Sequence, residues 1–438
     1  MKIKRVRMND GESYCILLNE DNFPLPYQNL FLTQQRRNAG ASSSSCYIAL
    51  EHLRFLEEVC DMMSIDLVQR CLKGDFLSEE ELETISLWAG RTVEALRNHI
   101  KALKKKTVKT KRPENKKLES ARATIVTKHD DSVLPSTQYN RMTTFAEYIG
   151  WLERKLNRAA SSNSEELLKR KRPPKLSMPD EFNPSRFKSL SKHQMARVLD
   201  VVRPDSPDNP WNNVGLCYRN QLIVNLLEAT GIRRGELLRL RISDIKRHAS
   251  KGHGAIVVRK KTDSDDDRID RPEAKTLGRV VPLDKRLLNL IDDYVVKYRA
   301  NVRGAEKIDY LLVTHNHRVR YNQALSKAAI NKVCRELAGA VGFKVHPHAF
   351  RHSWNDRFSE NADARIKKGH TTPEKSEMDR RKLMGWTASS SMARWYSKRF
   401  EERRAMETGL SLQKKNSEAI ERVIGVHDDD IECSGVRK

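Results

Sequence analysis

The chain has 438 residues, which is longer than one typical hydrophobic core supports and suits two or three domains. Its formal net charge is +24, with Lys and Arg along the whole length, which favours a polyanionic partner such as nucleic acid over a membrane surface. No apolar run approaches membrane-spanning length, and the 7 cysteines include no Cys-x-x-Cys pair. These features argue against membrane, zinc-cysteine and disulfide-framework proteins, so we expect a cytoplasmic protein with reduced cysteines.

The first part of the chain predicts a β-containing extension and then helices. Residues 1–46 mix short β-like runs, such as Ser13–Leu18, with prolines, and are interpreted as an N-terminal extension. From Tyr47 onwards apolar residues recur at helical spacing, which predicts an amphipathic helix with a second helix behind it. Ser78 and Glu81 then form the capping-box pattern that opens a third helix.

Two basic breaks divide the middle of the chain. Residues 92–103 predict a fourth helix, and the basic string 104–117 has almost nothing to bury, so it is a linker or a phosphate-contacting segment. Another amphipathic helix follows. The second basic break, within residues 169–182, is the predicted interdomain linker. It separates a helical region, residues 47–168, from a second domain, residues 183–438, which includes a C-terminal tail.

The second domain mixes helices with β-like runs. The apolar run Asn220–Leu227 has the character of a buried helix that ends at Gly231, and another helix begins near Arg234. Residues 254–258 and 278–283 predict strands, which an acidic and polar insertion separates, and the patterns after them are mostly helical. The sequence therefore predicts a mainly α protein with a small β-sheet.

Short motifs stand in a fixed order across this second domain. They are Thr230–Leu237 with Arg233, His348–His352 with Arg351, and Leu383–Trp386 with Tyr396 after it. In this order and at this separation they resemble the tyrosine recombinase, or phage integrase, family, whose signature is an Arg, a Lys in a β-hairpin, a His-x-x-Arg, a His or Trp, and a nucleophilic Tyr. The resemblance covers about the C-terminal half. It implies a helical core-binding domain, residues 47–168, that clamps DNA together with a mixed α/β catalytic domain.

The resemblance assigns a catalytic set to this chain. The set is Arg233, Lys275, His348, Arg351, Trp386 and Tyr396. The Tyr396 hydroxyl is the implied nucleophile, which keeps the phosphodiester energy in a covalent protein-DNA bond. Arg233 and Arg351 offer planar two-donor groups for the charge of the transition state, and Trp386 can donate a hydrogen bond from its indole nitrogen. Tyr396 follows Trp386 by one residue more than the family usually shows.

The supporting groups leave alternatives open. His348 can accept or donate the tyrosyl proton, with His346 and His352 as competitors. Glu236 stands three residues after Arg233, on the same helical side, and can orient it. The spacing of His348 and His352 also raises a metal site, but the Glu of a His-Glu-x-x-His motif is absent. We therefore predict no metal and no other cofactor.

The catalytic lysine, which would protonate the leaving 5′ oxygen, has two candidates. Lys275 stands before a β-like run that ends in Val-Pro-Leu, as in the family pattern. Lys261, before the insertion, competes with it. We predict Lys275 and keep Lys261 as the alternative lysine, because the insertion separates the two predicted strands.

The predicted activity is that of a site-specific recombinase or integrase of a mobile element, which cuts and rejoins double-stranded DNA through a covalent 3′-phosphotyrosyl intermediate. The resemblance implies a tetramer on paired DNA sites, with accessory recombination proteins as further partners. The tail beyond Phe400, with its apolar Ile420, Val423 and Ile424, can supply the contact between subunits. The alternatives are strand breakage like that of a type IB topoisomerase, and a DNA-binding regulator of the same fold that does not cleave.

Overall fold

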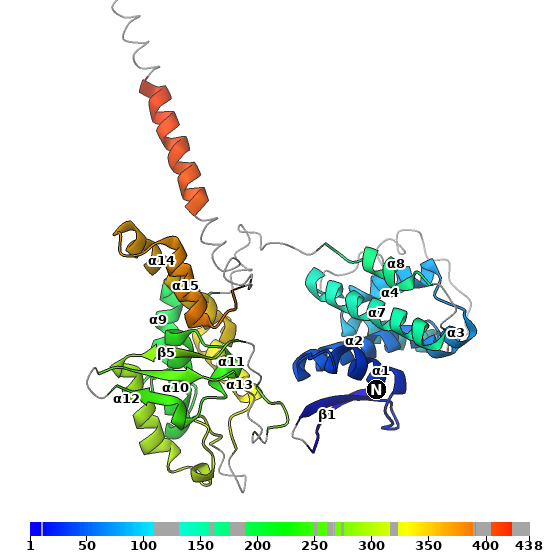
Figure 1. The fold of residues 1–438 in the computed structure, drawn as a ribbon, viewed down its shortest axis with the longest axis horizontal. Helices are drawn as coiled ribbons and strands as arrows, with labels where there is room; N and C mark the ends of the chain where they lie inside the picture. The colour runs from blue at the N-terminus through cyan, green and yellow to red at the C-terminus, as the bar shows by residue number, and fades with distance from the viewer. Residues whose placement is uncertain are drawn as a thin grey trace, which may run out of the picture. The chain divides into compact units, whose positions relative to one another are not determined.

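The computed structural model describes residues 1–9, 12–107, 131–157, 162–174, 189–248, 252–260, 266, 268–272, 276–315, 323–388, 390 and 404–422. The chain folds as two compact units, Met1–Pro179 and Asp180–Lys438, each with its own hydrophobic core (Figure 1). Helices dominate both units, with a small antiparallel sheet in each, which confirms the predicted fold class. The boundary between the units lies between Pro179 and Asp180. Residues 175–182 of the predicted linker lie outside the described residues, so the predicted domain bounds stay predictions.

The first unit opens with a hairpin and continues in helices. Strand β1 (Lys2–Arg7) pairs antiparallel with β2 (Ser13–Leu18), so that Lys2 lies opposite Leu18. The elements that follow are α1 (Pro26–Phe31), the π-helix η1 (Leu32–Arg37), α2 (Ser43–Met62), α3 (Leu67–Lys73), α4 (Glu79–Ala89), α5 (Val93–Thr107), α7 (Pro135–Leu156) and α8 (Ser164–Arg170). The β-like run Ser13–Leu18 and the predicted series of helices are therefore confirmed.

Two of these helices begin where a serine side chain caps the free amides of the first turn. The Ser42 hydroxyl caps α2, so this helix starts at Ser43, ahead of the predicted start at Tyr47. The predicted capping box of α4 is confirmed, because Ser78 and Glu81 each accept a hydrogen bond from the backbone amide of the other. Local side-chain chemistry thus fixes both starts.

Helix α7 organises the core of the first unit. It packs against α1, α2, α3, α4 and α8 and buries Phe145, Tyr148 and Leu152. Phe31 of α1 meets Tyr148 edge to face, with ring centroids 5.4 Å apart. Leu17 of β2 belongs to the same core. The N-terminal hairpin therefore shares one core with the helices after it.

The second unit contains a three-stranded antiparallel sheet among helices. Its strands β3 (Ile245–Arg247), β4 (Gly254–Val258) and β5 (Arg279–Leu283) pair in the order β3-β4-β5. The other elements are α9 (Lys192–Val201), α10 (Val214–Thr230), α11 (Arg234–Leu237), η4 (Ile242–Asp244), α12 (Lys285–Asp293), η5 (Tyr294–Arg299), η6 (Ala305–Lys307), α13 (Lys327–Val341), α14 (Pro347–Lys367), α15 (Pro373–Met384) and a helix over residues 404–422. The two predicted strands are confirmed as β4 and β5. Among the helices within the described ranges, none combines the length and apolarity that crossing a bilayer requires.

Helix α10 is the buried helix that the sequence predicts, and its end positions the segment after it. Leu222, Ile223 and Leu226 are fully buried in the core of the second unit. The helix ends at Gly231 with φ +59°, a left-handed conformation that glycine adopts without strain. A Cβ at Gly231 would lie only 2.8 Å from the ring of Trp354. Glycine therefore permits both the sharp turn and the close approach of α14.

Candidate active site

Arg351 joins three segments that are far apart in the sequence. It lies in α14 and is only 1% exposed. Its Nη1 donates to the Gly231 carbonyl at 2.7 Å, and its Nη2 donates to the Met384 carbonyl at 3.3 Å. Its guanidinium carbon lies 5.6 Å from the centroid of the Trp386 ring. Because a buried guanidinium stays charged and needs hydrogen-bond partners, these contacts hold the ends of α10 and α15 against α14.

Arg233 lies on the segment that Arg351 binds. It is the N-cap residue of α11, with an extended backbone that directs the chain into the helix. The Glu236 carboxylate accepts a hydrogen bond from the Arg233 amide at 3.0 Å and contacts its Nη1 at 3.4 Å. The Arg233 side chain remains 20% exposed, so an anion can still reach it. The two predicted catalytic arginines therefore lie on adjoining segments.

The Glu236 carboxylate is the centre of a buried ion-pair network. It is 2% exposed and accepts hydrogen bonds from Arg279 Nη2 at 2.7 Å and Thr276 Oγ1 at 2.5 Å. Arg279 also donates through Nε to the Leu383 carbonyl at 2.6 Å. The network thus ties α11 to the start of β5, and β5 to the end of α15.

The network keeps Glu236 ionised. Burial by itself would raise the pKa of this carboxyl, but the hydrogen bond and the charge of Arg279, with hydrogen bonds from Thr276 and the Arg233 amide, lower it to about 2. Glu236 therefore carries a negative charge at any physiological pH. That charge is fixed beside Arg233 and can hold its guanidinium in place.

Arg279 and Thr276 were missed as site residues by reasoning from the sequence. Arg279 stands at the start of a strand that its apolar residues predict, and Thr276 directly follows Lys275 in the sequence. The available signal was an arginine at the start of an apolar strand. The role of Arg279 depends on its close approach to Gly385, at the end of α15, where an added Cβ would lie 2.8 Å from Arg279 Nη1. That approach is visible only in the folded chain.

His348 stands in the first turn of α14, at the surface of the second unit. Partial burial of its ring, then the positive charges of Arg351 and Arg233, lower the pKa of His348 below its ordinary value. The neutral imidazole therefore predominates at neutral pH. A neutral ring next to two cations can accept a proton, which is the role predicted for it.

The competing histidines have different surroundings. His346 caps α14, because its Nδ1 accepts the Ala349 amide at 3.1 Å. The ring of His352 lies 6.1 Å from that of His348. Within the described ranges, no group of three or more His, Cys, Asp or Glu side chains is arranged to hold a metal ion. The capping bond gives His346 a structural role that His348 does not have.

Trp386 belongs to a small aromatic cluster behind Arg351. It is 6% exposed and packs with Met384 and Trp354. Trp354 donates from Nε1 to the Ala229 carbonyl at 3.0 Å, which anchors the cluster to the end of α10. Trp386 therefore supports the same junction that Arg351 binds.

Three predicted positions cannot be placed in this geometry. Lys275, the alternative Lys261 and the nucleophile candidate Tyr396 lie outside the described residues, and their assignments stay predictions. Thr276, which directly follows Lys275 in the sequence, is described and contacts Glu236.

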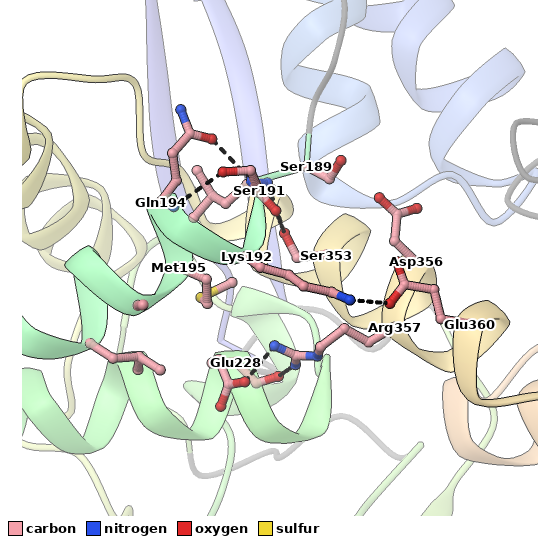
Figure 2. A pocket seen from close by; sticks show the side chains of 13 residues that line it. Ser189, Ser191, Lys192, Gln194, Met195, Glu228, Ser353, Asp356, Arg357 and Glu360 are labelled. Carbon is pink, nitrogen blue, oxygen red and sulfur yellow. Dashed lines mark hydrogen bonds and ion pairs between the residues drawn. The ribbon is translucent and has the colours of Figure 1, made fainter. Parts of the chain in front are cut away.

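A groove of about 760 Å³ lies elsewhere in the second unit, along α9, α10 and α14. Figure 2 shows its charged side chains. Lys192 contacts Glu360 at 2.9 Å, and Arg357 contacts Glu228 at 2.5 Å. The members of the predicted catalytic set that the structure describes, Arg233, His348, Arg351 and Trp386, do not line it. This groove is therefore separate from the candidate active site.

Comparison with known proteins identifies the family. Residues 188–403 match the profile described as "Phage integrase family". The chain belongs to this family of tyrosine recombinases. The matched region of this phage integrase family member contains every predicted catalytic position, from Arg233 to Tyr396.

Several known proteins are similar to this family member. Tyrosine recombinase XerA of Pyrococcus furiosus is 28% identical over 180 residues, which cover 41% of this chain and 51% of the relative. Tyrosine recombinase XerD of Listeria monocytogenes serotype 4b is 26% identical over 170 residues, or 38% and 49% of the two chains. The chain spans about half the length of these curated relatives. A structure of the XerH site-specific recombinase bound to its difH substrate has 17% identity and a TM-score of 0.41, and covers 87% of this chain and 96% of that chain.

Proposed function

We propose that the chain is a site-specific DNA recombinase, or integrase, that cuts and rejoins double-stranded DNA through a covalent 3′-phosphotyrosyl intermediate. The observation that supports this most directly is the pair of hydrogen bonds that Arg351 donates to the Gly231 and Met384 carbonyls. These two bonds join the segment carrying Arg233 to the segment leading to Trp386. Two guanidinium groups on adjoining segments, beside a neutral His348, suit the transfer of a phosphoryl group to a tyrosine. The mobile-element role rests on the family resemblance.

In the proposed reaction, the Tyr396 hydroxyl attacks the scissile phosphorus and its proton passes to neutral His348. Arg233 and Arg351 donate hydrogen bonds to the non-bridging oxygens, where the negative charge of the transition state develops. The bond from phosphorus to the 5′ oxygen breaks, and Lys275 gives that oxygen a proton. A 5′-hydroxyl then attacks the phosphotyrosine, and the Tyr396 oxygen leaves the phosphorus. This step re-forms the phosphodiester without energy from a nucleoside triphosphate.

The Glu236 network supports this mechanism by positioning. Catalysis of phosphoryl transfer depends on holding the cations at fixed places before the charge develops. Arg279 holds the Glu236 carboxylate, and that carboxylate holds both the amide and the guanidinium of Arg233. Glu236 and Arg279 therefore act on the reaction through Arg233, as positioning residues.

Double-stranded DNA and further copies of the chain are the proposed partners. The net charge of +24 gives the electrostatic attraction that DNA binding requires. The helix over residues 404–422 exposes Met406, Leu410, Leu412 and Ile420. Exposed apolar side chains along one helix are a contact for another protein surface. We assign this helix to the contact between subunits of a tetramer on paired sites.

Trapping the covalent intermediate tests the proposal. A duplex selected from a random-sequence pool by binding to the protein, and then nicked at successive positions, should form a 3′-phosphotyrosyl adduct without added divalent metal. Tyr396→Phe should keep DNA binding and lose the adduct, whereas the matched control Tyr321→Phe should keep both. An adduct that persists in Tyr396→Phe and maps to another tyrosine would contradict the assignment.

The same experiment separates the alternatives. Wild-type protein that binds the selected duplex without any adduct would behave as a regulator. Relaxation of supercoiled plasmid that has no selected site would indicate activity like that of a type IB topoisomerase. Strand exchange that requires two selected sites is the result expected for a recombinase.

A further inference from the structure

A pair of histidines faces each other across the turn between β3 and β4. In the antiparallel register Arg247 lies opposite Gly254, so His248 and His253 are the next opposing residues. The His248 amide donates to the His253 carbonyl at 3.0 Å, which continues the ladder by one pair. Opposing residues of an antiparallel pair project to the same face of the sheet. The two imidazole rings are therefore neighbours, with centroids 5.5 Å apart.

The glycines on either side of His253 shape this turn. Gly252 has φ +60°, a left-handed conformation that favours glycine. A Cβ at Gly254 would collide with the Lys246 carbonyl, so glycine allows the two strands to approach closely at this point. The hairpin backbone therefore holds His253 opposite His248.

The spacing of the two rings suits a metal ion that both of them bind. Imidazole nitrogens bind Zn²⁺ at about 2.1 Å, and two of them on one tetrahedral ion leave the ring centroids roughly 5 Å apart. The observed separation of 5.5 Å is close to that arrangement. Both side chains are exposed, so an ion can reach them together with the waters that complete its coordination.

The charges around the pair also permit a bound cation. The guanidinium of Arg247 forms an ion pair with Asp292, so its charge is locally compensated. Arg247 also belongs to the opposite face of the sheet, because successive side chains of a strand alternate. Lys246 shares the face of His248, but it is exposed, and water and salt screen its charge there.

We propose that His248 and His253 form a two-histidine site for a divalent metal ion of the zinc type, with water in the remaining positions. Imidazole is a ligand that suits Zn²⁺, Cu²⁺ and Ni²⁺ alike, so the ring pair defines a class of ion. The bound ion joins β3 to β4 at the turn. It stabilises the hairpin by mass action, because it binds only when the two strands are paired.

The proposed metal site is separate from the candidate active site. The histidine pair lies at the start of β4, whereas Val258, at the end of this strand, lines a small cavity together with Glu236. A strand rises about 3.3 Å per residue, so the distance from His253 to Val258 along β4 is roughly 16 Å. The inference therefore stands independently of the proposed reaction, and the ion takes no part in that reaction.

Zinc titration of the full chain tests the inference. The variants are His248→Asn and His253→Asn, and the matched control is His193→Asn, which removes an exposed histidine from α9 of the same unit. In calorimetry, wild type and the control should bind one Zn²⁺ ion that both hairpin variants bind at least about tenfold more weakly. Loss of an outer-shell partner already has an effect of that size, and these residues would be direct ligands.

Hydrogen exchange locates the bound ion in the chain. In peptides that span β3 and β4, Zn²⁺ should slow exchange in wild type and in the control, and should leave it unchanged in both hairpin variants. Without metal, the hairpin should exchange equally in all four proteins, because the replaced side chains are exposed.

Two outcomes would overturn the inference. One is equal Zn²⁺ affinity in wild type and in both hairpin variants. The other is exchange in the wild-type hairpin that does not respond to Zn²⁺, whatever the calorimetry shows. Either result would mean that the protein binds an adventitious ion only.

Discussion

Replacing Glu236 with Gln should destabilise the second unit by about 3 kcal/mol at pH 7. Folding lowers the pKa of this carboxyl from 4.5 to about 2, and each pKa unit corresponds to about 1.4 kcal/mol. Gln keeps the shape and one oxygen that can accept from Thr276, but it carries no charge. Arg279, whose side chain is 5% exposed, would then be buried without its counter-charge.

The pH dependence of the effect follows from the direction of the shift. A carboxyl whose pKa is lowered by folding contributes its full stability above the unfolded value, here 4.5, and loses it as the pH falls through the folded value of about 2. The difference in unfolding free energy between wild type and Glu236→Gln should therefore stay constant near neutral pH. It should shrink as the pH falls from 4.5 towards 2.

Hydrogen exchange with mass spectrometry in increasing urea measures this difference for each unit separately. Exchange in peptides that span β5 and α15 reports on the unfolding of the second unit. Glu228→Gln is the matched control, because its pair with Arg357 is partly exposed and should be worth at most about 1 kcal/mol. The assignment of Glu236 as the centre of the network would be refuted if Glu236→Gln lowered the unfolding free energy of the second unit by less than about 1 kcal/mol at pH 7. It would also be refuted if the unfolding free energy of the variant varied with acid pH as that of wild type does.

Three further predictions concern the cations of the site. Arg233→Lys and Arg351→Lys should each slow formation of the covalent adduct by about 100-fold or more in single-turnover assays, because a point charge cannot reproduce the planar donor pair. Their DNA affinity should stay within about threefold of the wild-type value. Near-wild-type rates would instead make these arginines part of the general basic surface. Arg351→Lys should also lower the Tm, since Arg351 binds two buried carbonyls. Cleavage by Lys275→Ala should be rescued by DNA in which sulfur replaces the bridging 5′ oxygen, because sulfur is a leaving group that needs no proton. Rescue of cleavage by Lys261→Ala instead would transfer the catalytic role to Lys261.

The sequence by itself determined the local elements and the family. The capping box at Ser78 and the helix that ends at Gly231 could be predicted, because caps and helix periodicity depend on residues a few positions apart. The order of the motifs around Arg233 and Arg351 indicates the phage integrase family without any knowledge of tertiary contacts. The assignments of Lys275 and Tyr396 rest on that order alone, since both residues lie outside the described ranges.

Tertiary structure alone decided which groups meet. The bond from Arg351 to the Gly231 carbonyl spans 120 residues, and no local pattern encodes a contact of that separation. The pairing of Glu236 with Arg279 likewise follows from how α11, β5 and α15 pack. Burial removes water as a hydrogen-bond partner, so each charge must find its counter-charge in the folded chain, and that choice is made by packing between distant segments.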